Sequence, residues 1–122
     1  MEIDNEQFNL QFPVSNLILM ENWQERAHQF AKKHNLTHSP GVTALDLLSE
    51  FGEVAKELLK ATDYGRHDPT ENPAIADELG DMLYSLCQLA TAVNVDLDHA
   101  LTTALAKYEA RWKEKGHPGS GE

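Results

Sequence analysis

Residues 47–56, LLSEFGEVAK, and residues 77–86, DELGDMLYSL, are the two stretches that decide the fold. Each places two carboxylates three positions apart among apolar, helix-forming residues, and the pairs are Glu50 with Glu53 and Glu78 with Asp81. In an α-helix this spacing puts both acids of a pair on one face, about a turn apart. Four carboxylates that converge in a helical core require a cation, and Mg²⁺ takes oxygen ligands of this kind. The two pairs therefore predict a metal site of the sort that acts on phosphates.

The acids lie at the edge of the predicted core, where Leu47 and Val54 adjoin them. Within each helix, like charges four residues apart destabilise the helix by about 0.2–0.5 kcal/mol per pair. These pairs are Asp46 with Glu50, Glu53 with Glu57, and Asp77 with Asp81. A solvated acidic face is the alternative explanation, but residues 73–93 contain no basic residue to offset the repulsion. The pattern favours a compensating ion.

Composition restricts the class of protein further. The chain has 122 residues and a formal net charge of −10, so we expect a single domain that binds neither nucleic acid nor an anionic membrane. The single cysteine, Cys87, excludes an internal disulfide and is expected to be a small buried hydrophobic residue. The N-terminus lacks the basic region of a signal peptide, and the longest apolar run, residues 17–20, is too short to span a bilayer. A soluble cytoplasmic protein is expected.

Helix signals without strand-like alternation predict an all-α fold of the four-helix-bundle type. Residues 1–14 are expected to form a loose N-terminal arm, and Ser15 or Asn16 to cap a first helix that runs to about His34. The apolar stripe predicted for this helix comprises Leu19, Trp23, Ala27 and Phe30.

The next two helices are each predicted to begin at a capping residue followed by a proline. Ser39-Pro40 predicts a helix to about Thr62, and Asn72-Pro73 predicts one to near Val93. Asp96 is expected to cap the last helix, which ends at about Lys115 because Gly116 follows. The chain is then one domain, 1–122, with a helical core over residues 15–115 and a flexible tail over residues 116–122. Apolar residues such as Phe8 and Phe12 exceed what four short helices cover, so we expect a homodimer or homotetramer.

The order and spacing of the two acidic stretches resemble the all-α nucleoside triphosphate pyrophosphohydrolases, the MazG-like and dimeric dUTPase-like families. Residues 107–112, KYEARW, are similar to the Lys-aromatic-x-x-Arg-aromatic segment of MazG domains. His38-Ser39-Pro40 resembles the entry to the first metal helix in the dCTP-preferring branch. The resemblance covers about residues 20–115.

This resemblance implies hydrolysis of a (deoxy)nucleoside triphosphate to the monophosphate and pyrophosphate, with Mg²⁺ or Mn²⁺ as cofactor. The metal ligands that it implies are Glu50, Glu53, Glu78 and Asp81. Mg²⁺ bridges phosphate oxygens and neutralises their charge, and a spare carboxylate accepts the proton of the attacking water. Some family members carry a glutamate for this role just before the first motif. Here that position is Ser49, so Glu50 is the candidate catalytic base.

The last helix supplies candidate substrate contacts. Lys107 and Arg111 share a helix face, which alone would suggest an exposed basic patch near a helix C-terminus. The resemblance implies instead that they hold the β- and γ-phosphates, although Leu105 stands where MazG domains often have asparagine. Tyr108 is the candidate for contacting sugar or base, and His38 is a candidate for either a substrate contact or a loop cap. Core packing is favoured over base stacking for the large aromatic residues Trp23, Phe30, Tyr84 and Trp112.

Two other metal classes and one non-enzymatic class compete with this interpretation. His67-Asp68 is a dyad of the kind found in His-Asp phosphohydrolases, but it precedes Pro69 in a predicted loop. Glu25 and His28 have the spacing of a carboxylate di-iron bundle, which needs a second such element that the chain lacks. A helical self-association module, or a nucleotide sensor without turnover, is the remaining alternative.

Overall fold

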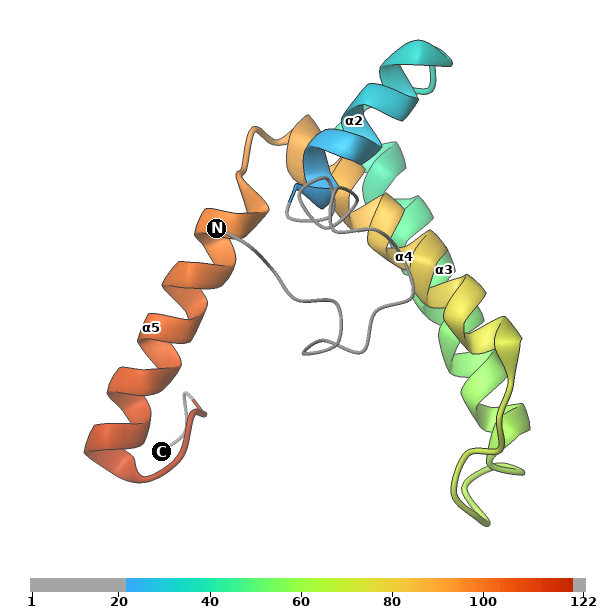
Figure 1. Cartoon of the computed structure of the whole chain (residues 1–122), viewed down its shortest axis with the longest axis vertical. Coiled ribbons are helices and arrows are strands. Elements are labelled where there is room, and N and C mark those ends of the chain that lie inside the picture. Colours follow the sequence, from blue (N-terminus) through green and yellow to red (C-terminus); the bar gives the residue numbers. More distant parts are fainter. Residues whose placement is uncertain (1–21, 120–122) are drawn as a thin grey trace, which may run out of the picture.

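The computed structural model describes residues 22–119, which form four helices and no strand (Figure 1). The helices are α2 (Trp23–Lys33), α3 (Pro40–Ala61), α4 (Pro73–Ala92) and α5 (Leu97–Lys115). The prediction of an all-α fold is confirmed. None of the helices in this described part is long and apolar enough to cross a bilayer.

Side-chain caps start the last three helices where the sequence predicts them. The hydroxyl of Ser39 accepts a hydrogen bond from the Val42 N–H, and the side chain of Asn72 accepts one from the Ala74 N–H. Asp96 accepts hydrogen bonds from two backbone N–H groups at the start of α5. Each cap satisfies donors that the first helical turn leaves without a partner. At the far end of α5, Gly116 takes the left-handed conformation, with φ of 76°, and ends the helix.

The start of α2 differs from the prediction. The helix begins at Trp23 because Asn22 caps it, accepting a hydrogen bond of 3.1 Å from the Glu25 N–H. A capping side chain offers the backbone an alternative to continued helix, which a periodic apolar pattern does not reveal. The predicted caps Ser15 and Asn16, the arm over residues 1–14 and Leu19 of the stripe lie outside the described residues.

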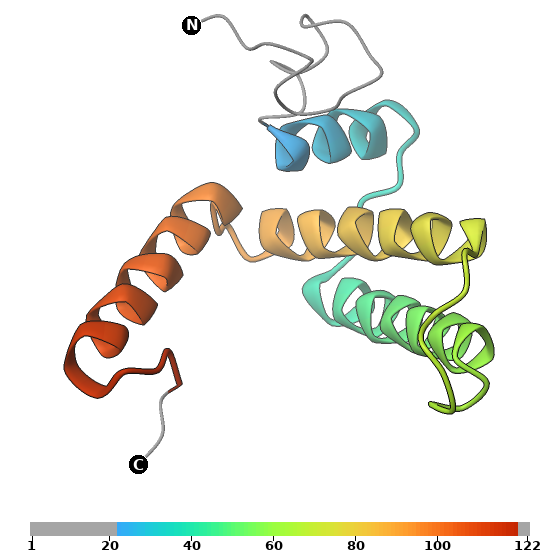
Figure 2. The ribbon, with the colours of Figure 1, turned by 60° about the horizontal axis from the view of Figure 1, so that its bottom comes forward.

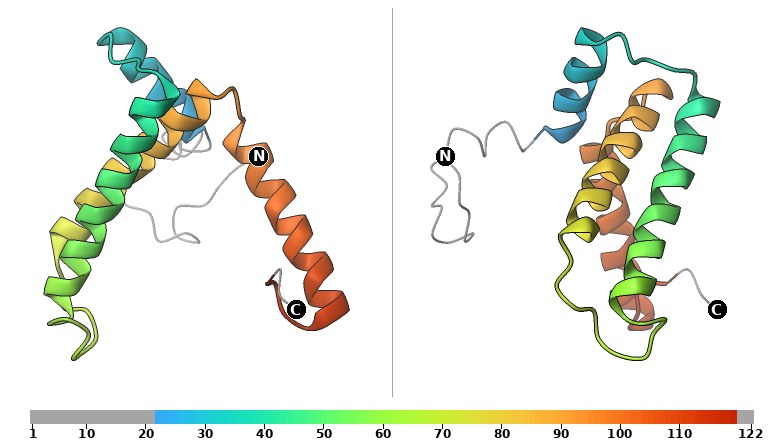
Figure 3. Two further views of the ribbon diagram at one scale, coloured as in Figure 1. Left: turned by 180° about the vertical axis from the view of Figure 1, so that it is seen from behind. Right: turned by 90° about the vertical axis from the view of Figure 1, so that its right-hand side faces the viewer.

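The helices α3 and α4 form an antiparallel hairpin, and α2 packs on α4 (Figures 2 and 3). Small residues dominate the core, which lets the helices approach closely: its buried apolar residues are Ala27, Ala31, Val54, Ala61, Cys87 and Ala90. Cys87 is only 1% exposed, which confirms its expected burial, and that burial raises the pKa of its thiol.

One glutamine ties α2 to the connection between α4 and α5. The Gln24 amide nitrogen donates to the Thr91 hydroxyl and to the Val95 carbonyl, and its amide oxygen accepts from the Leu97 N–H. The amide thus uses both of its polar atoms, as half-buried amides generally do.

Helix α5 leaves the hairpin at an angle and stands apart from it along most of its length (Figures 1 and 3). None of its residues is buried. The predicted core packing of Trp23, Phe30 and Trp112 is wrong within the single chain, since each is at least half exposed. These rings belong to surfaces that the described residues of one chain do not cover.

Candidate metal centre

Three carboxylates from the two acidic stretches meet on the hairpin. Glu50 comes from α3, and Glu78 and Asp81 come from α4. One oxygen of each lies within 4.8 Å of an oxygen of the others. Glu50 and Glu78 are half-buried and Asp81 is exposed. The antiparallel pairing of α3 and α4 brings the two motifs to the same height, so residues far apart in sequence share one site.

The predicted fourth ligand, Glu53, is not part of this cluster. Its carboxylate lies 3.8 Å from the Lys56 ammonium, one turn further along α3. Both side chains are substantially exposed, so this ion pair is weak. Glu53 is still close enough to raise the pKa of Glu78, and it stands at the margin of the cluster.

The carboxylates of the cluster repel one another electrostatically. The pKa of Glu78 is raised above its ordinary value, first by desolvation and then by the negative charges of Glu53, Asp81, Glu50 and Asp77. All of these causes act in the same direction. The described fold therefore holds several negative charges together at an energetic cost.

This cost has a pH signature in the metal-free protein. Because the folded-state pKa of Glu78 exceeds its ordinary value of 4.5, the native state binds more protons than the unfolded state between the two pKa values. The free energy of unfolding then falls as pH rises through this window. We expect Glu78→Gln to melt at nearly the same temperature as wild type below the window and at a higher temperature above it. Thermal melts in chelator across pH check this, and a difference that does not change with pH would contradict it.

One opening borders the cluster, and a second, smaller cavity shares part of its lining. The opening beside the acids has a volume of about 510 Å³ and is lined by Phe30, Asp46, Glu50, Asp81, Tyr84 and Ser85. The second, of about 160 Å³, is lined by Leu36, His38, Thr43, Asp46, Tyr84, Ser85 and Gln88. Three lining residues are common to both, so the smaller cavity adjoins the space next to the carboxylates.

The predicted substrate residues lie in two separate parts of the structure. His38 lies in the loop between α2 and α3 and lines the smaller cavity. Lys107, Tyr108 and Arg111 lie on α5, which does not bring them to the carboxylates of the same chain. The Lys107 ammonium sits 5.3 Å from the centre of the Tyr108 ring, and Arg111 donates to the Pro118 carbonyl.

Neither rival metal class gains support from the described residues. The Nδ1 atom of His67 lies 2.7 Å from the carbonyl oxygen of Asp68 in an exposed loop, and within residues 22–119 neither residue belongs to a group of three or more side chains that could share a metal. Glu25 instead accepts a hydrogen bond from the Gln29 amide on the exposed face of α2.

Sequence reasoning missed the polar residues of the smaller cavity. Ser85 and Gln88 lie in an apolar part of α4, and both are buried. The signal that would have revealed them is a pair of polar residues at positions where the helix periodicity expects the core.

The described residues thus form an all-α hairpin that presents three clustered carboxylates beside an open cavity. The pattern of the MazG nucleotide pyrophosphohydrolase domain matches residues 38–115. The chain belongs to this family, and the membership supports a nucleotide pyrophosphohydrolase activity in general. The comparisons with curated proteins and with solved structures found no match.

Proposed function

We propose that the protein hydrolyses (deoxy)nucleoside triphosphates to nucleoside monophosphate and pyrophosphate with the help of Mg²⁺, for which Mn²⁺ can substitute. The observation that carries the proposal is the convergence of Glu50, Glu78 and Asp81 in a chain of the MazG family. We propose that this activity takes place in the cytoplasm, where it would control nucleotide concentrations or remove unwanted nucleotides from the pool.

The carboxylates present fit a hard divalent cation. Two oxygens bound to one Mg²⁺ lie at most about 4.2 Å apart, so oxygens within 4.8 Å of one another need only small side-chain movements to share an ion. The set contains oxygen alone, which suits Mg²⁺ and Mn²⁺. When bound, the ion would neutralise charge on the phosphate oxygens. Glu50, Glu78 and Asp81 would hold it, with Glu53 at the margin as the fourth acid.

A carboxylate of the cluster also serves as the base in this proposal. Glu50 is half-buried and lines the larger opening, so it faces the space that a triphosphate would occupy. It accepts a proton of the attacking water as the water oxygen bonds to the α-phosphorus and the bond from that phosphorus to the α–β bridging oxygen breaks, which releases pyrophosphate. Ser49, its neighbour, has no group able to take that proton near neutral pH.

In this proposal, a second subunit brings the carboxylates to the substrate residues of α5. The apolar residues Leu101, Leu105, Tyr108 and Trp112 recur with helical spacing along α5 and are all exposed. A second exposed apolar row runs along α3: Leu45, Leu48, Phe51 and Leu59. Rows of exposed large apolar residues are typical of an interface. We propose a homodimer or homotetramer in which α5 of one subunit delivers Lys107, Tyr108 and Arg111 to the carboxylates of another.

Product analysis tests the proposed reaction. We expect ³¹P NMR of a nucleoside triphosphate mixed with protein and Mg²⁺ to show pyrophosphate and monophosphate appearing together, and to show no reaction in excess chelator. Orthophosphate as the first product would contradict the proposal. Nucleotide binding without turnover would favour the sensor alternative.

A further inference from the structure

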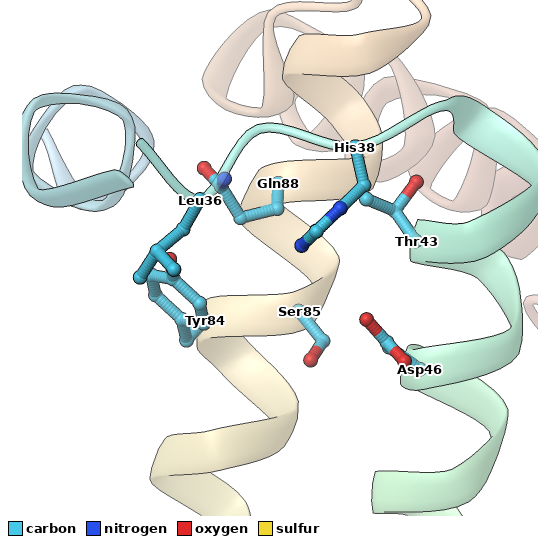
Figure 4. A pocket seen from close by; sticks show the side chains of 7 residues that line it. All are labelled: Leu36, His38, Thr43, Asp46, Tyr84, Ser85 and Gln88. Carbon is cyan, nitrogen blue, oxygen red and sulfur yellow. The ribbon is translucent and has the colours of Figure 1, made fainter. Parts of the chain in front are cut away.

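The smaller cavity holds a buried amide that the proposed reaction does not use. His38 projects into it from the α2–α3 loop, between Gln88 on α4 and Asp46 on α3 (Figure 4). Leu36 and Tyr84 lie on the side of the cavity away from Asp46, and Ser85 lies between Tyr84 and Asp46 (Figure 4). Asp46, Tyr84 and Ser85 also line the opening beside the carboxylates.

Gln88 is only 8% exposed, and its amide oxygen accepts no hydrogen bond from any residue in the described part of the chain. A buried polar atom without a partner is costly and rare in folded proteins. Gln24 provides the contrast within the same fold, because it uses both polar atoms of its amide in three hydrogen bonds. The amide of Gln88 is therefore suited to a partner that enters the cavity.

The chemistry of an amide restricts that partner. A glutamine presents a donor and an acceptor side by side, and rotation of its terminal torsion exchanges them. The edge of a pyrimidine base shows the complementary pair: an acceptor beside an amino group in cytosine, or a carbonyl beside an N–H in uracil. Adenine also presents an amino group beside an acceptor, and glutamine pairs with it through two hydrogen bonds in DNA, so the size of the cavity must separate the two classes of base.

The volume restricts the partner further. At about 160 Å³, the cavity is close in size to a cavity of about 150 Å³ that accommodates benzene. One six-membered ring therefore fits, whereas the fused rings of a purine would extend beyond it. An aromatic wall for such a ring is present, since Tyr84 is held by the Phe30 ring, with centroids 6.0 Å apart in an edge-on arrangement.

We propose that this cavity receives the pyrimidine ring of the substrate and that Gln88 selects the ring by pairing with its polar edge. The biological role of this binding rests on the proposed nucleotide hydrolysis. The binding itself rests only on the cavity and on the amide of Gln88. The triphosphate would then extend through the shared wall of Asp46, Tyr84 and Ser85 toward the carboxylates.

Nucleosides test the cavity without metal or turnover. We expect titration with deoxycytidine or deoxyuridine to shift the side-chain amide resonances of Gln88 in ¹H–¹⁵N spectra, and an equal concentration of deoxyadenosine to leave them unchanged. Gln88→Leu assigns those resonances, because they disappear from its spectrum. The variant should also lower the affinity for the more tightly bound of the two pyrimidine nucleosides by about tenfold to a hundredfold. Gln88→Met serves in its place if the leucine variant does not fold.

The matched control is Gln24→Leu, which removes a hydrogen-bonded amide outside the cavity. It should lower the melting temperature and leave the pyrimidine affinity unchanged, whereas Gln88→Leu should melt no lower than wild type. Equal binding of deoxyadenosine, or wild-type affinity in both Gln88 variants, would overturn the inference. A nucleoside has no phosphate to hydrolyse, so its binding tests the cavity separately from the reaction. If the protein binds pyrimidine nucleosides but does not hydrolyse nucleoside triphosphates, the cavity assignment stands and the proposed reaction is wrong.

Discussion

Asp81→Asn should reduce turnover of a nucleoside triphosphate with Mg²⁺ by at least about a hundredfold, because losing even the partners of metal ligands typically costs 10–100-fold. The substitution keeps the size of the side chain and removes its charge from the cluster with Glu50 and Glu78. It also removes one cause of the raised pKa of Glu78. The metal-free variant should therefore be as stable as wild type, or more stable. Steady-state assays and melts in chelator measure the two effects.

Asp77→Asn is the matched control for this substitution. Asp77 is an exposed acid one turn earlier on α4 and lies outside the carboxylate cluster. Its change to asparagine should leave turnover within a few-fold of wild type. Equal losses from the two substitutions would mean that general acidity of the helix, and not a defined set of ligands, supports the activity.

Mixing two impaired variants should restore activity, if α5 completes the site of a neighbouring subunit. Arg111→Ala alone should lower turnover by about tenfold or more, because hydrogen bonds to charged groups contribute about 1.5–3 kcal/mol. When Asp81→Asn and Arg111→Ala chains exchange subunits, some sites combine intact carboxylates with an intact Arg111. Random assembly of equal amounts predicts roughly one quarter of wild-type activity, because each site draws its two halves independently.

The control for this experiment is the same mixture kept below the temperature of subunit exchange. Its activity should equal the mean of the two separate variants. If the exchanged mixture also shows only that mean, Arg111 acts within its own chain or not at all, and the proposed arrangement between subunits is wrong. A stable folded monomer in sedimentation would contradict it as well.

The boundaries of α3, α4 and α5 were predictable because local chemistry determines them. Ser39, Asn72 and Asp96 each cap a helix with their own side chain, and proline or glycine marks the adjoining position. Such signals need no tertiary information. The meeting of Glu50 with the acids of α4 was predictable for a related reason, because a hairpin of two helices brings residues at equal heights together.

Three other features depend on interactions that a sequence pattern does not contain. Glu53 lies beside Lys56 and outside the cluster, which depends on side-chain rotamers. The position of α5 depends on contacts at one short connection, where Gln24 accepts from Leu97. The role of Gln88 depends on which cavity its amide borders, and periodicity alone assigns that position only to the core.

The most direct test of the carboxylate cluster is its effect on stability when Mg²⁺ is added, since an ion that binds only the native site raises the melting temperature. At a concentration about one hundred times the dissociation constant, this linkage adds about 2.7 kcal/mol to the free energy of unfolding. Wild type and Asp77→Asn should therefore melt several degrees higher in Mg²⁺ than in chelator, while Asp81→Asn should lose most of that rise. Equal rises in all three proteins, or no rise in wild type, would contradict the assignment of a metal site to Glu50, Glu78 and Asp81.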